Sequence, residues 1–207
     1  MSDKSIVQSI CVYCGSSPGE SADYVASAEQ LGAAMAAGGK RLVYGGGNKG
    51  IMGAVARGAR GGGGPVTGVI PQFLMDKERP DAGGADDPDM NHENGDRLLV
   101  TQTMHERKTL LFEHADAFVA MPGGIGTLEE LVEMMTWSQL GLHAKPIILG
   151  NIGGFWDHFS ALIEQMTDAG FVHTANKVRA IPVNRVEDIL PAIDEEAARL
   201  ETLRVKL

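Results

Sequence analysis

The chain has 207 residues, of which 43% are hydrophobic and 22% charged, and its formal net charge is −9 at pH 7. The length fits one domain spanning 1–207, and the composition is that of a globular protein, which excludes a disordered or fibrous chain. The negative charge argues against sequence-independent nucleic-acid binding, since such binding needs a basic surface that displaces counterions from phosphates.

Short β-branched or apolar runs alternate along the chain with longer runs of helical period, which is typical of α/β proteins. Strands are predicted near 6–13, 41–44, 66–70, 97–101, 117–121, 146–149 and 178–181. Helices are predicted over 21–37, 51–60, 104–115, 127–140, 155–169 and 186–200. We therefore expect a doubly wound, Rossmann-like parallel sheet of about seven strands with helices on both faces.

The segment 75–96 breaks this alternation. Its residues 76–96 hold eight acidic side chains against Lys77 and Arg79, and prolines and glycines are frequent in it. Such a composition predicts a long acidic, mobile loop, which serves either as a lid or only as a solvated insertion. The rest of the chain carries a net charge of only −3, so an anionic ligand is compatible with it.

Glycine-rich segments follow several predicted strands, at the edge of the sheet where α/β proteins bind ligands. Gly45-x-Gly47-x-x-Gly50 has the spacing of a dinucleotide fingerprint, but it follows the second strand, and no acidic residue ends the next one. It also lacks the Lys-Ser/Thr pair of an ATPase phosphate loop. Gly45, Gly46 and Gly47 are expected either to allow a close backbone approach or only to form a tight turn.

The run from Pro122 to Glu130 contains Gly123, Gly124 and Gly126 just before a predicted helix. Small residues and free N–H groups at a helix start suit a phosphate oxygen, so this run is a candidate phosphate site. Thr127-Leu128-Glu129-Glu130 also has the spacing of a helix capping box, and the spacing alone does not decide between the two readings.

Glu130 and Arg107 are the candidate catalytic side chains. If Glu130 lies in the first helical turn, the helix dipole stabilises its carboxylate and keeps it ionised at neutral pH. An ionised carboxylate suits cleavage of an N-glycosidic bond, because the transition state resembles an oxocarbenium ion. Arg107 can hold a phosphate or the departing base, although an arginine at a helix start is more often a surface ion-pair member.

Other chemistries find little support. Cys11-Val12-Tyr13-Cys14 lacks a second pair of metal ligands, so we interpret both cysteines as packing thiols. The six histidines show no metalloprotease spacing, so no metal is predicted. No apolar run approaches the roughly 20 residues that span a bilayer, and residues 1–7 lack a secretion signal. The chain is predicted to be cytoplasmic and not associated with a membrane.

Three motifs together resemble the LONELY GUY (LOG) family of cytokinin-activating phosphoribohydrolases. They are Tyr44-Gly45-Gly46-Gly47, Met104-His105-Glu106-Arg107-Lys108 and the run from Pro122 to Glu130, within a resemblance that covers about 9–170. The resemblance implies hydrolysis of cytokinin riboside 5′-monophosphates or AMP to the free base, with Arg107 and Glu130 as the catalytic pair. It implies a homodimer with the site near the interface and no cofactor. Relatives have also been labelled lysine decarboxylases, but the sequence specifies no pyridoxal phosphate site.

The same resemblance implies a set of positions that bind the nucleoside 5′-monophosphate, and the acidic segment after Glu78 could displace that residue. The set is Gly45, Gly46, Gly47, Glu78, Met104, Lys108, Gly123, Gly124, Ile125, Gly126, Thr127, Leu128, Glu129 and Thr136. Two other functions stay open at this stage: a general purine-monophosphate nucleosidase of salvage, and a non-catalytic carrier of a nucleotide-like cofactor with the same fold.

Overall fold

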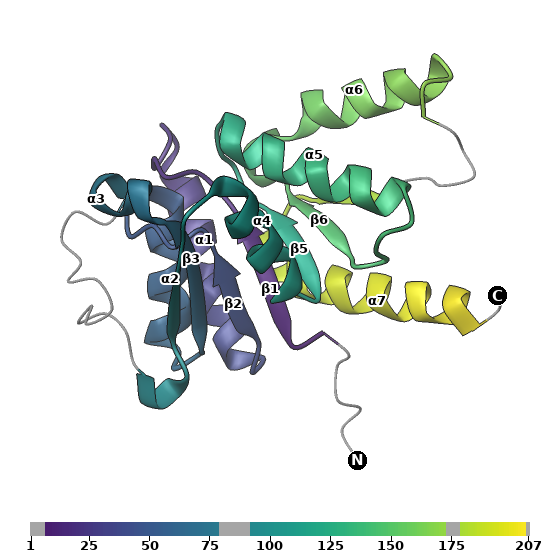
Figure 1. Ribbon diagram of the computed structural model, residues 1–207. Coiled ribbons are helices and arrows are strands. Elements are labelled where there is room, and N and C mark those ends of the chain that lie inside the picture. Colours follow the sequence, from purple (N-terminus) through teal and green to yellow (C-terminus); the bar gives the residue numbers. More distant parts are fainter. Residues whose placement is uncertain (1–6, 79–91, 173–178, 206–207) are drawn as a thin grey trace.

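The computed structural model describes residues 7–78, 92–172 and 179–205. All seven strands found there form one parallel sheet in the order β4-β3-β2-β1-β5-β6-β7 (Figure 1). The strands are β1 Ser9–Tyr13, β2 Arg41–Tyr44, β3 Val66–Pro71, β4 Arg97–Thr101, β5 Ala117–Ala120, β6 Ile147–Gly150 and β7 Ala180–Val183.

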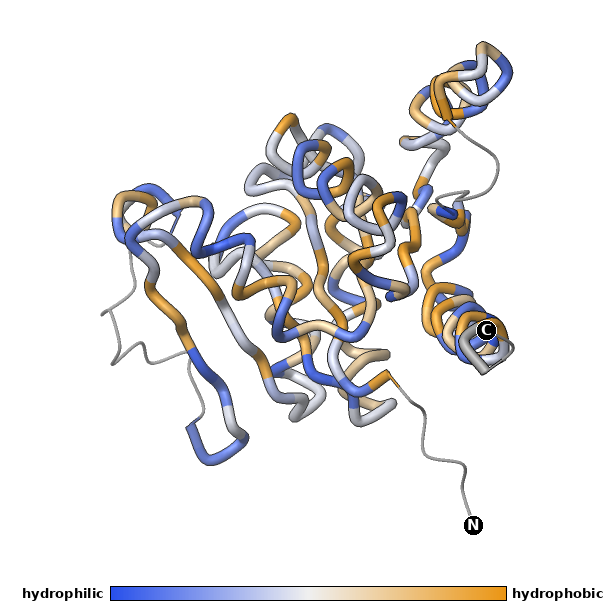
Figure 2. The backbone as a smooth tube through the Cα atoms, turned by 45° about the vertical axis from the view of Figure 1, so that its right-hand side comes forward, coloured by the Kyte–Doolittle hydropathy of each residue, from blue (hydrophilic) through white to orange (hydrophobic). Residues whose placement is uncertain are grey.

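Helices cover both faces of this sheet, and each face has its own hydrophobic core. One face packs against α1 Ala22–Ala37, α2 Gly50–Gly61 and α7 Ile189–Val205. The other packs against α4 Met104–Glu113, α5 Ile125–Gln139 and α6 Asp157–Asp168. Hydrophobic stretches recur along the chain in Figure 2, and β1, β2, β3, β5 and β6 are almost wholly buried, as expected when both faces of a parallel sheet are covered.

Glycines let α1 and α2 pack closely on the first face. A Cβ atom on Gly32 would lie 2.1 Å from the Val55 carbonyl oxygen, and one on Gly58 would lie 1.9 Å from the Glu29 carbonyl oxygen. Any larger residue would force the two helices apart. This contact anchors α2, and therefore the Gly45–Gly47 turn that precedes it, against the body of the domain.

The order in which strands are added to the sheet reverses at β1. This strand pairs with β2 on one side and with β5 on the other. The loops that leave β1 and β5 therefore diverge, and this opening is where α/β proteins bind ligands. The two loops remain connected at their base, because the Gly15 N–H donates to the Pro122 carbonyl oxygen over 3.1 Å.

The doubly wound parallel sheet predicted from the sequence is confirmed, with differences at the ends of elements. The first strand begins at Ser9, and the last strand lies two residues later than predicted. The last helix begins at Ile189, after a 3-10 turn over Val186–Asp188.

The prediction of an irregular segment over 75–96 is partly wrong. Its start forms α3 Met75–Glu78, and its end forms a 3-10 turn at His92–Asn94. The Asp96 carboxylate is buried, where it accepts hydrogen bonds from Arg60 and from the Val66 N–H. Residues 79–91 lie outside the described residues. Within the described parts of the chain, no helix has the length and apolar character needed to cross a membrane.

Candidate active site

A cavity of about 300 Å³ opens where the loops after β1 and β5 diverge. Its walls come from the ends of β1 and β2, from α2, α3 and α4, and from the first turns of α5. The described residues that line it are Val12, Tyr13, Cys14, Gly15, Ser16, Gly45, Met52, Glu78, Met104, Arg107, Gly124, Ile125, Gly126, Thr127, Glu129 and Glu130. The cavity thus brings together the candidate catalytic pair and part of each glycine-rich turn.

Arg107 is buried at the wall of this cavity, with only 6% of its surface exposed. Its Nε donates to the Val69 carbonyl oxygen, and its Nη2 donates to the Gly45 carbonyl oxygen, each over 3.2 Å. A Cβ atom on Gly45 would lie 2.2 Å from Nη2, so only glycine leaves room for the guanidinium. The close approach expected at the Gly45–Gly47 turn is therefore made by Arg107, which is not a surface ion-pair residue.

Glu130 faces Arg107 across the cavity, with 3.9 Å between its Oε1 and the Nη1 of Arg107. It is the sixth residue of α5 and is 9% exposed, so the prediction of a carboxylate in the first helical turn is wrong. Burial raises the pKa of Glu130 to about 7, although Arg107 opposes this shift. Burial therefore opposes the full ionisation at neutral pH that a first-turn position would have favoured.

The N-terminus of α5 is open toward the cavity. Gly124 is its N-cap, no side chain caps the helix, and a Cβ atom on Gly124 or Gly126 would meet nothing within 4 Å. Gly123 is different, because a Cβ atom there would lie 2.1 Å from the Thr127 hydroxyl oxygen. The free N–H groups of the first turn and the positive end of the helix dipole suit an anionic group such as a phosphate.

The capping box expected at Thr127 to Glu130 does not form, because α5 begins at Ile125 and Thr127 is a buried residue of its first turn. A capping box occurs instead at the start of α4, which positions Arg107. The Thr103 Oγ1 accepts from the Glu106 N–H over 3.1 Å, and the Glu106 carboxylate accepts from the Thr103 N–H over 3.3 Å.

Glu78 ends the short helix α3 and brings a second carboxylate to the cavity. Its backbone carbonyl accepts from the Asn48 N–H over 3.0 Å, which ties α3 to the turn after β2. Burial raises the pKa of Glu78, and Arg107 opposes this. Its buried Oε2 has no hydrogen-bond partner, and it lies where a Cβ atom on Gly47 would come within 3.5 Å. Gly46 adopts a positive φ of 82°, which favours glycine at that position.

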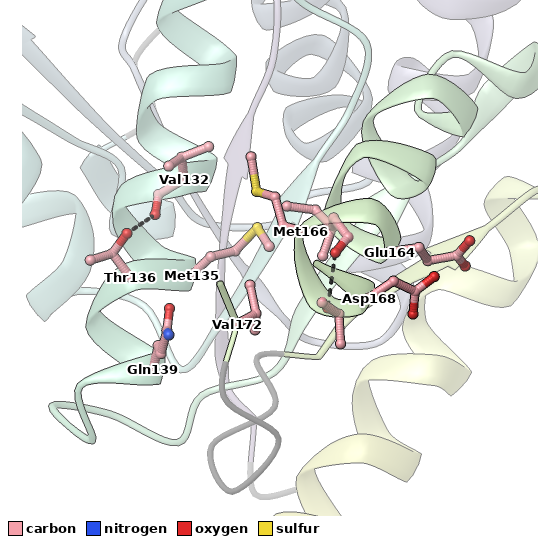
Figure 3. A pocket seen from close by; sticks show the side chains of 10 residues that line it. Val132, Met135, Thr136, Gln139, Glu164, Met166, Asp168 and Val172 are labelled. Atoms are coloured by element: carbon pink, nitrogen blue, oxygen red, sulfur yellow. Dashed lines mark hydrogen bonds between the residues drawn. The ribbon is translucent and has the colours of Figure 1, made fainter. Parts of the chain in front are cut away.

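Six positions of the predicted binding set are not among the described residues that line the cavity, namely Gly46, Gly47, Lys108, Gly123, Leu128 and Thr136. Leu128 packs against the core beneath α4, α5 and α6. The Lys108 ammonium lies between the carboxylates of Glu129 and Glu133, at 2.6 and 3.0 Å. Thr136 lies outside the cavity, in a groove of about 500 Å³ between α5 and α6, where its hydroxyl donates to the Val132 carbonyl (Figure 3).

The sequence-based reasoning did not assign Tyr13, Cys14 or Met52 to the site, although all three line the cavity. Tyrosine, cysteine and methionine are common in hydrophobic cores, so the residue types gave no indication of a site. Only their position at the end of β1 or the start of α2 could have indicated it. Cys11 and Cys14 are free, buried thiols, as predicted, and burial raises the pKa of both. Neither is the reactive thiolate of a nucleophilic enzyme.

The charges of the cavity suit a reaction that develops positive charge on a bound anion. One guanidinium and the three carboxylates of Glu78, Glu129 and Glu130 meet a helix N-terminus that offers free N–H groups. No lysine is among the described residues that line the cavity, so they do not fit a site for pyridoxal phosphate, which needs an amine for its imine. Among the residues described, no three His, Cys, Asp or Glu side chains are grouped as metal ligands would be.

Known proteins resemble this chain over most of its length. A family described as "possible lysine decarboxylase" matches residues 52–193. The probable cytokinin riboside 5′-monophosphate phosphoribohydrolase LOGL5 of Oryza sativa subsp. japonica is 39% identical over 90% of this chain and 71% of its own. The cytokinin riboside 5′-monophosphate phosphoribohydrolase LOG3 of Arabidopsis thaliana is 35% identical over 99% of this chain and 90% of its own.

Solved structures share the fold at lower sequence identity. The molybdenum cofactor carrier protein of Chlamydomonas reinhardtii superposes with a TM-score of 0.64 at 21% identity, covering 92% of this chain and 98% of its own. At this level of identity the similarity establishes the architecture and not the activity.

Proposed function

Since the chain belongs to the LOG family of cytokinin riboside 5′-monophosphate phosphoribohydrolases, we propose that it hydrolyses the N-glycosidic bond of nucleoside 5′-monophosphates of this class. The products are the free base and ribose 5-phosphate. The observation that carries this proposal is the buried pair of Arg107 and Glu130 beside an uncapped helix N-terminus. A site that only bound phosphate would gain nothing from a carboxylate next to its anionic ligand.

The reaction breaks the bond between C1′ of the ribose and the base nitrogen, and forms a bond between C1′ and a water oxygen. Positive charge develops on the ribose as the base departs, and the Glu130 carboxylate stabilises it. The same carboxylate, with a pKa of about 7, accepts the proton of the attacking water at neutral pH. Arg107 donates a hydrogen bond to the departing base, which takes the electron pair of the broken bond. The proton that Glu130 accepted from the water then passes to this base, which leaves as the neutral free base.

The first turn of α5 holds the 5′-phosphate in this proposal. Gly124 and Gly126 leave open space, so phosphate oxygens can approach the N–H groups without meeting a Cβ atom. The Glu78 carboxylate, whose buried Oε2 lacks a partner, accepts from the ribose hydroxyls. Both roles are proposals for a bound substrate, and no cofactor or metal takes part in them.

The proposal is tested by incubating the purified protein with AMP and with N6-isopentenyladenosine monophosphate, and separating the products by chromatography. We expect free base and ribose 5-phosphate in equal amounts. The ratio of kcat/KM for the two substrates then decides between a cytokinin-activating enzyme and a general purine-monophosphate nucleosidase, because specificity is a ratio of these values. Absence of free base with every nucleotide would end the proposal.

A carrier of a nucleotide-like cofactor is the competing function that the shared fold allows. A carrier binds its ligand tightly and releases it unchanged. Calorimetry with AMP, followed by analysis of the same sample for adenine, separates the two functions. If binding releases heat but the AMP is still intact at the end, the carrier function is favoured. The buried Glu130 would then have no chemical role.

We further propose a homodimer that uses the groove between α5 and α6. Met135 and Met166 point toward each other across this groove in Figure 3, and Thr136 lies on its α5 side. Val132 and Met166 line it with exposed side chains, and Leu140, Leu162 and Phe171 are exposed on or just after α5 and α6. A monomer rarely exposes so many together. Light scattering should give twice the chain mass, and Met166→Glu should give the single mass.

The proposed location is the cytoplasm. Cys11 and Cys14 lie three residues apart and remain free thiols, as is typical of a reducing compartment. Fractionation of cells that express a tagged full-length chain tests this placement.

A further inference from the structure

Lys108 has two carboxylate partners and does not line the cavity. Its Nζ lies 2.6 Å from the Glu129 Oε1 and 3.0 Å from the Glu133 Oε1, and its side chain is only 17% exposed. The hydrogen bond to Glu129 raises the pKa of Lys108, so it stays charged. These contacts join α4 to α5. Lys108 directly follows Arg107 on α4, and Glu129 directly precedes Glu130 on α5.

The two glutamates need a cation between them. Glu129 and Glu133 are four residues apart on α5, a spacing at which like charges repel each other. The Glu133 side chain is 20% exposed, and its buried Oε2 has no hydrogen-bond partner. Without Lys108, the Glu133 carboxylate would also lose the contact that its Oε1 makes with the ammonium group. The lysine is therefore the cation that offsets the repulsion between these two carboxylates.

We infer that Lys108 is a positioning residue that ties α4 to α5 and thereby holds Arg107 beside Glu130, and that it is not a phosphate ligand. This inference depends on the proposed function only for the reaction assigned to Glu130. The catalytic pair comes from two different helices and is separated by 3.9 Å, so its geometry depends on how α4 and α5 are held. The bridge through Lys108 is a charged connection between those helices, next to the pair.

The bridge also controls the charge around Glu130. The groups that act on Glu130, or whose own pKa responds to it, are Arg107 and Lys108 from α4, Glu129 from α5, Glu78 from α3, and Cys11, Tyr13 and Cys14 from β1 and its end. Burial raises the pKa values of the two thiols and the phenol, so all three are neutral. Removing Lys108 deletes one cation and exposes Glu130 to the full charge of Glu129.

The test uses the full chain and its Lys108→Met, Lys108→Arg, Glu129→Gln and Glu133→Gln variants. Glutamate labelled with ¹³C at the carboxyl group reports the titration of Glu130, whose signal is the one missing from Glu130→Gln. We expect the Glu130 midpoint to move up by about half a pH unit or more in Lys108→Met and down in Glu129→Gln. Arg57→Met is the control, because Arg57 pairs with Glu29 on an exposed surface, and it should leave the midpoint unchanged.

Kinetics and binding then separate positioning from phosphate contact. For positioning, kcat/KM should fall about tenfold or more in Lys108→Met, recover in Lys108→Arg, and fall no further when Glu133→Gln is added to Lys108→Met. The Kd for ribose 5-phosphate, measured by calorimetry, should stay within twofold.

A Kd for ribose 5-phosphate that weakens tenfold, with an unmoved Glu130 midpoint, would overturn the inference and make Lys108 a phosphate ligand. An unmoved midpoint with an unchanged Kd would overturn it too. If the unmodified chain releases no base from any nucleotide, the proposed function fails, while the titration and the Kd still decide the role of Lys108.

Discussion

Replacing Glu130 by glutamine should stabilise the protein while it abolishes catalysis. The pKa of this carboxyl is about 7 in the folded protein, against its ordinary value of 4.5. Each pH unit between these values costs about 1.4 kcal/mol, so ionising Glu130 lowers the free energy of unfolding by about 3 kcal/mol at pH 8. The side chain is only 11% exposed, so solvent screens this cost only weakly.

The sign of the pH dependence follows from the raised pKa. A carboxyl with a raised pKa binds its proton more tightly in the folded state, so its cost is complete above pH 7 and disappears as the pH falls toward 4.5. Urea unfolding at pH 8 and at pH 5, at one protein concentration, measures the difference. We expect the free energy of unfolding of Glu130→Gln to exceed that of the unmodified protein by about 1–3 kcal/mol at pH 8. At pH 5 the two free energies should be nearly equal.

Glu113→Gln is the control for this experiment, because Glu113 is an exposed glutamate of α4. It should change the free energy of unfolding by less than about 0.5 kcal/mol at either pH. The reasoning about Glu130 is refuted if Glu130→Gln is no more stable than the unmodified protein at pH 8, or if its gain is the same at both pH values.

Three further predictions concern the site and its support. The kcat/KM of the unmodified protein should fall tenfold per pH unit well below pH 7, because the reaction needs the ionised Glu130; a flat profile from pH 5 to 8 would contradict this. Gly45→Ala should lower kcat/KM by about 100-fold, because the new Cβ atom displaces the Arg107 guanidinium. Product assays at fixed times measure this loss, and full activity would refute the close contact between Gly45 and Arg107. Gly58→Ala should lower the free energy of unfolding in urea by about 1–3 kcal/mol, because its Cβ atom would meet the backbone of α1. Gly61→Ala has open space around it and should leave that free energy unchanged or raise it. Equal effects of the two substitutions would contradict the α1–α2 contact.

The alternation of apolar strands and amphipathic helices was sufficient to predict the parallel sheet. The strand over Arg41–Tyr44 was placed correctly, because a short apolar run is bounded there by Lys40 and by glycines. The last strand was placed two residues too early, because the prediction ended it before Pro182, whereas β7 is an edge strand, in which a proline is tolerated. The edge of the sheet that carries the cavity followed from where the glycine-rich turns lie in the sequence.

The environment of Glu130 could not be predicted from local patterns. Thr127-x-x-Glu130 has the sequence of a capping box, but Thr127 is buried against Gly123 and the helix begins two residues earlier. That shift moves Glu130 from a dipole-stabilised first turn to a buried second turn. Its raised pKa depends on contacts with α4 and β1, which are distant in sequence. The bridge made by Lys108 depends on the same tertiary packing.

The most direct test of the whole account is a product assay with the unmodified chain, Glu130→Gln and Arg107→Met at pH 8 under single-turnover conditions. The account predicts equal amounts of free base and ribose 5-phosphate from the unmodified chain, and a loss of at least about 100-fold in the rate constant for both variants. It also predicts that Glu130→Gln still binds ribose 5-phosphate with little change in Kd. Base release by Glu130→Gln at the unmodified rate would contradict the central role of this carboxylate.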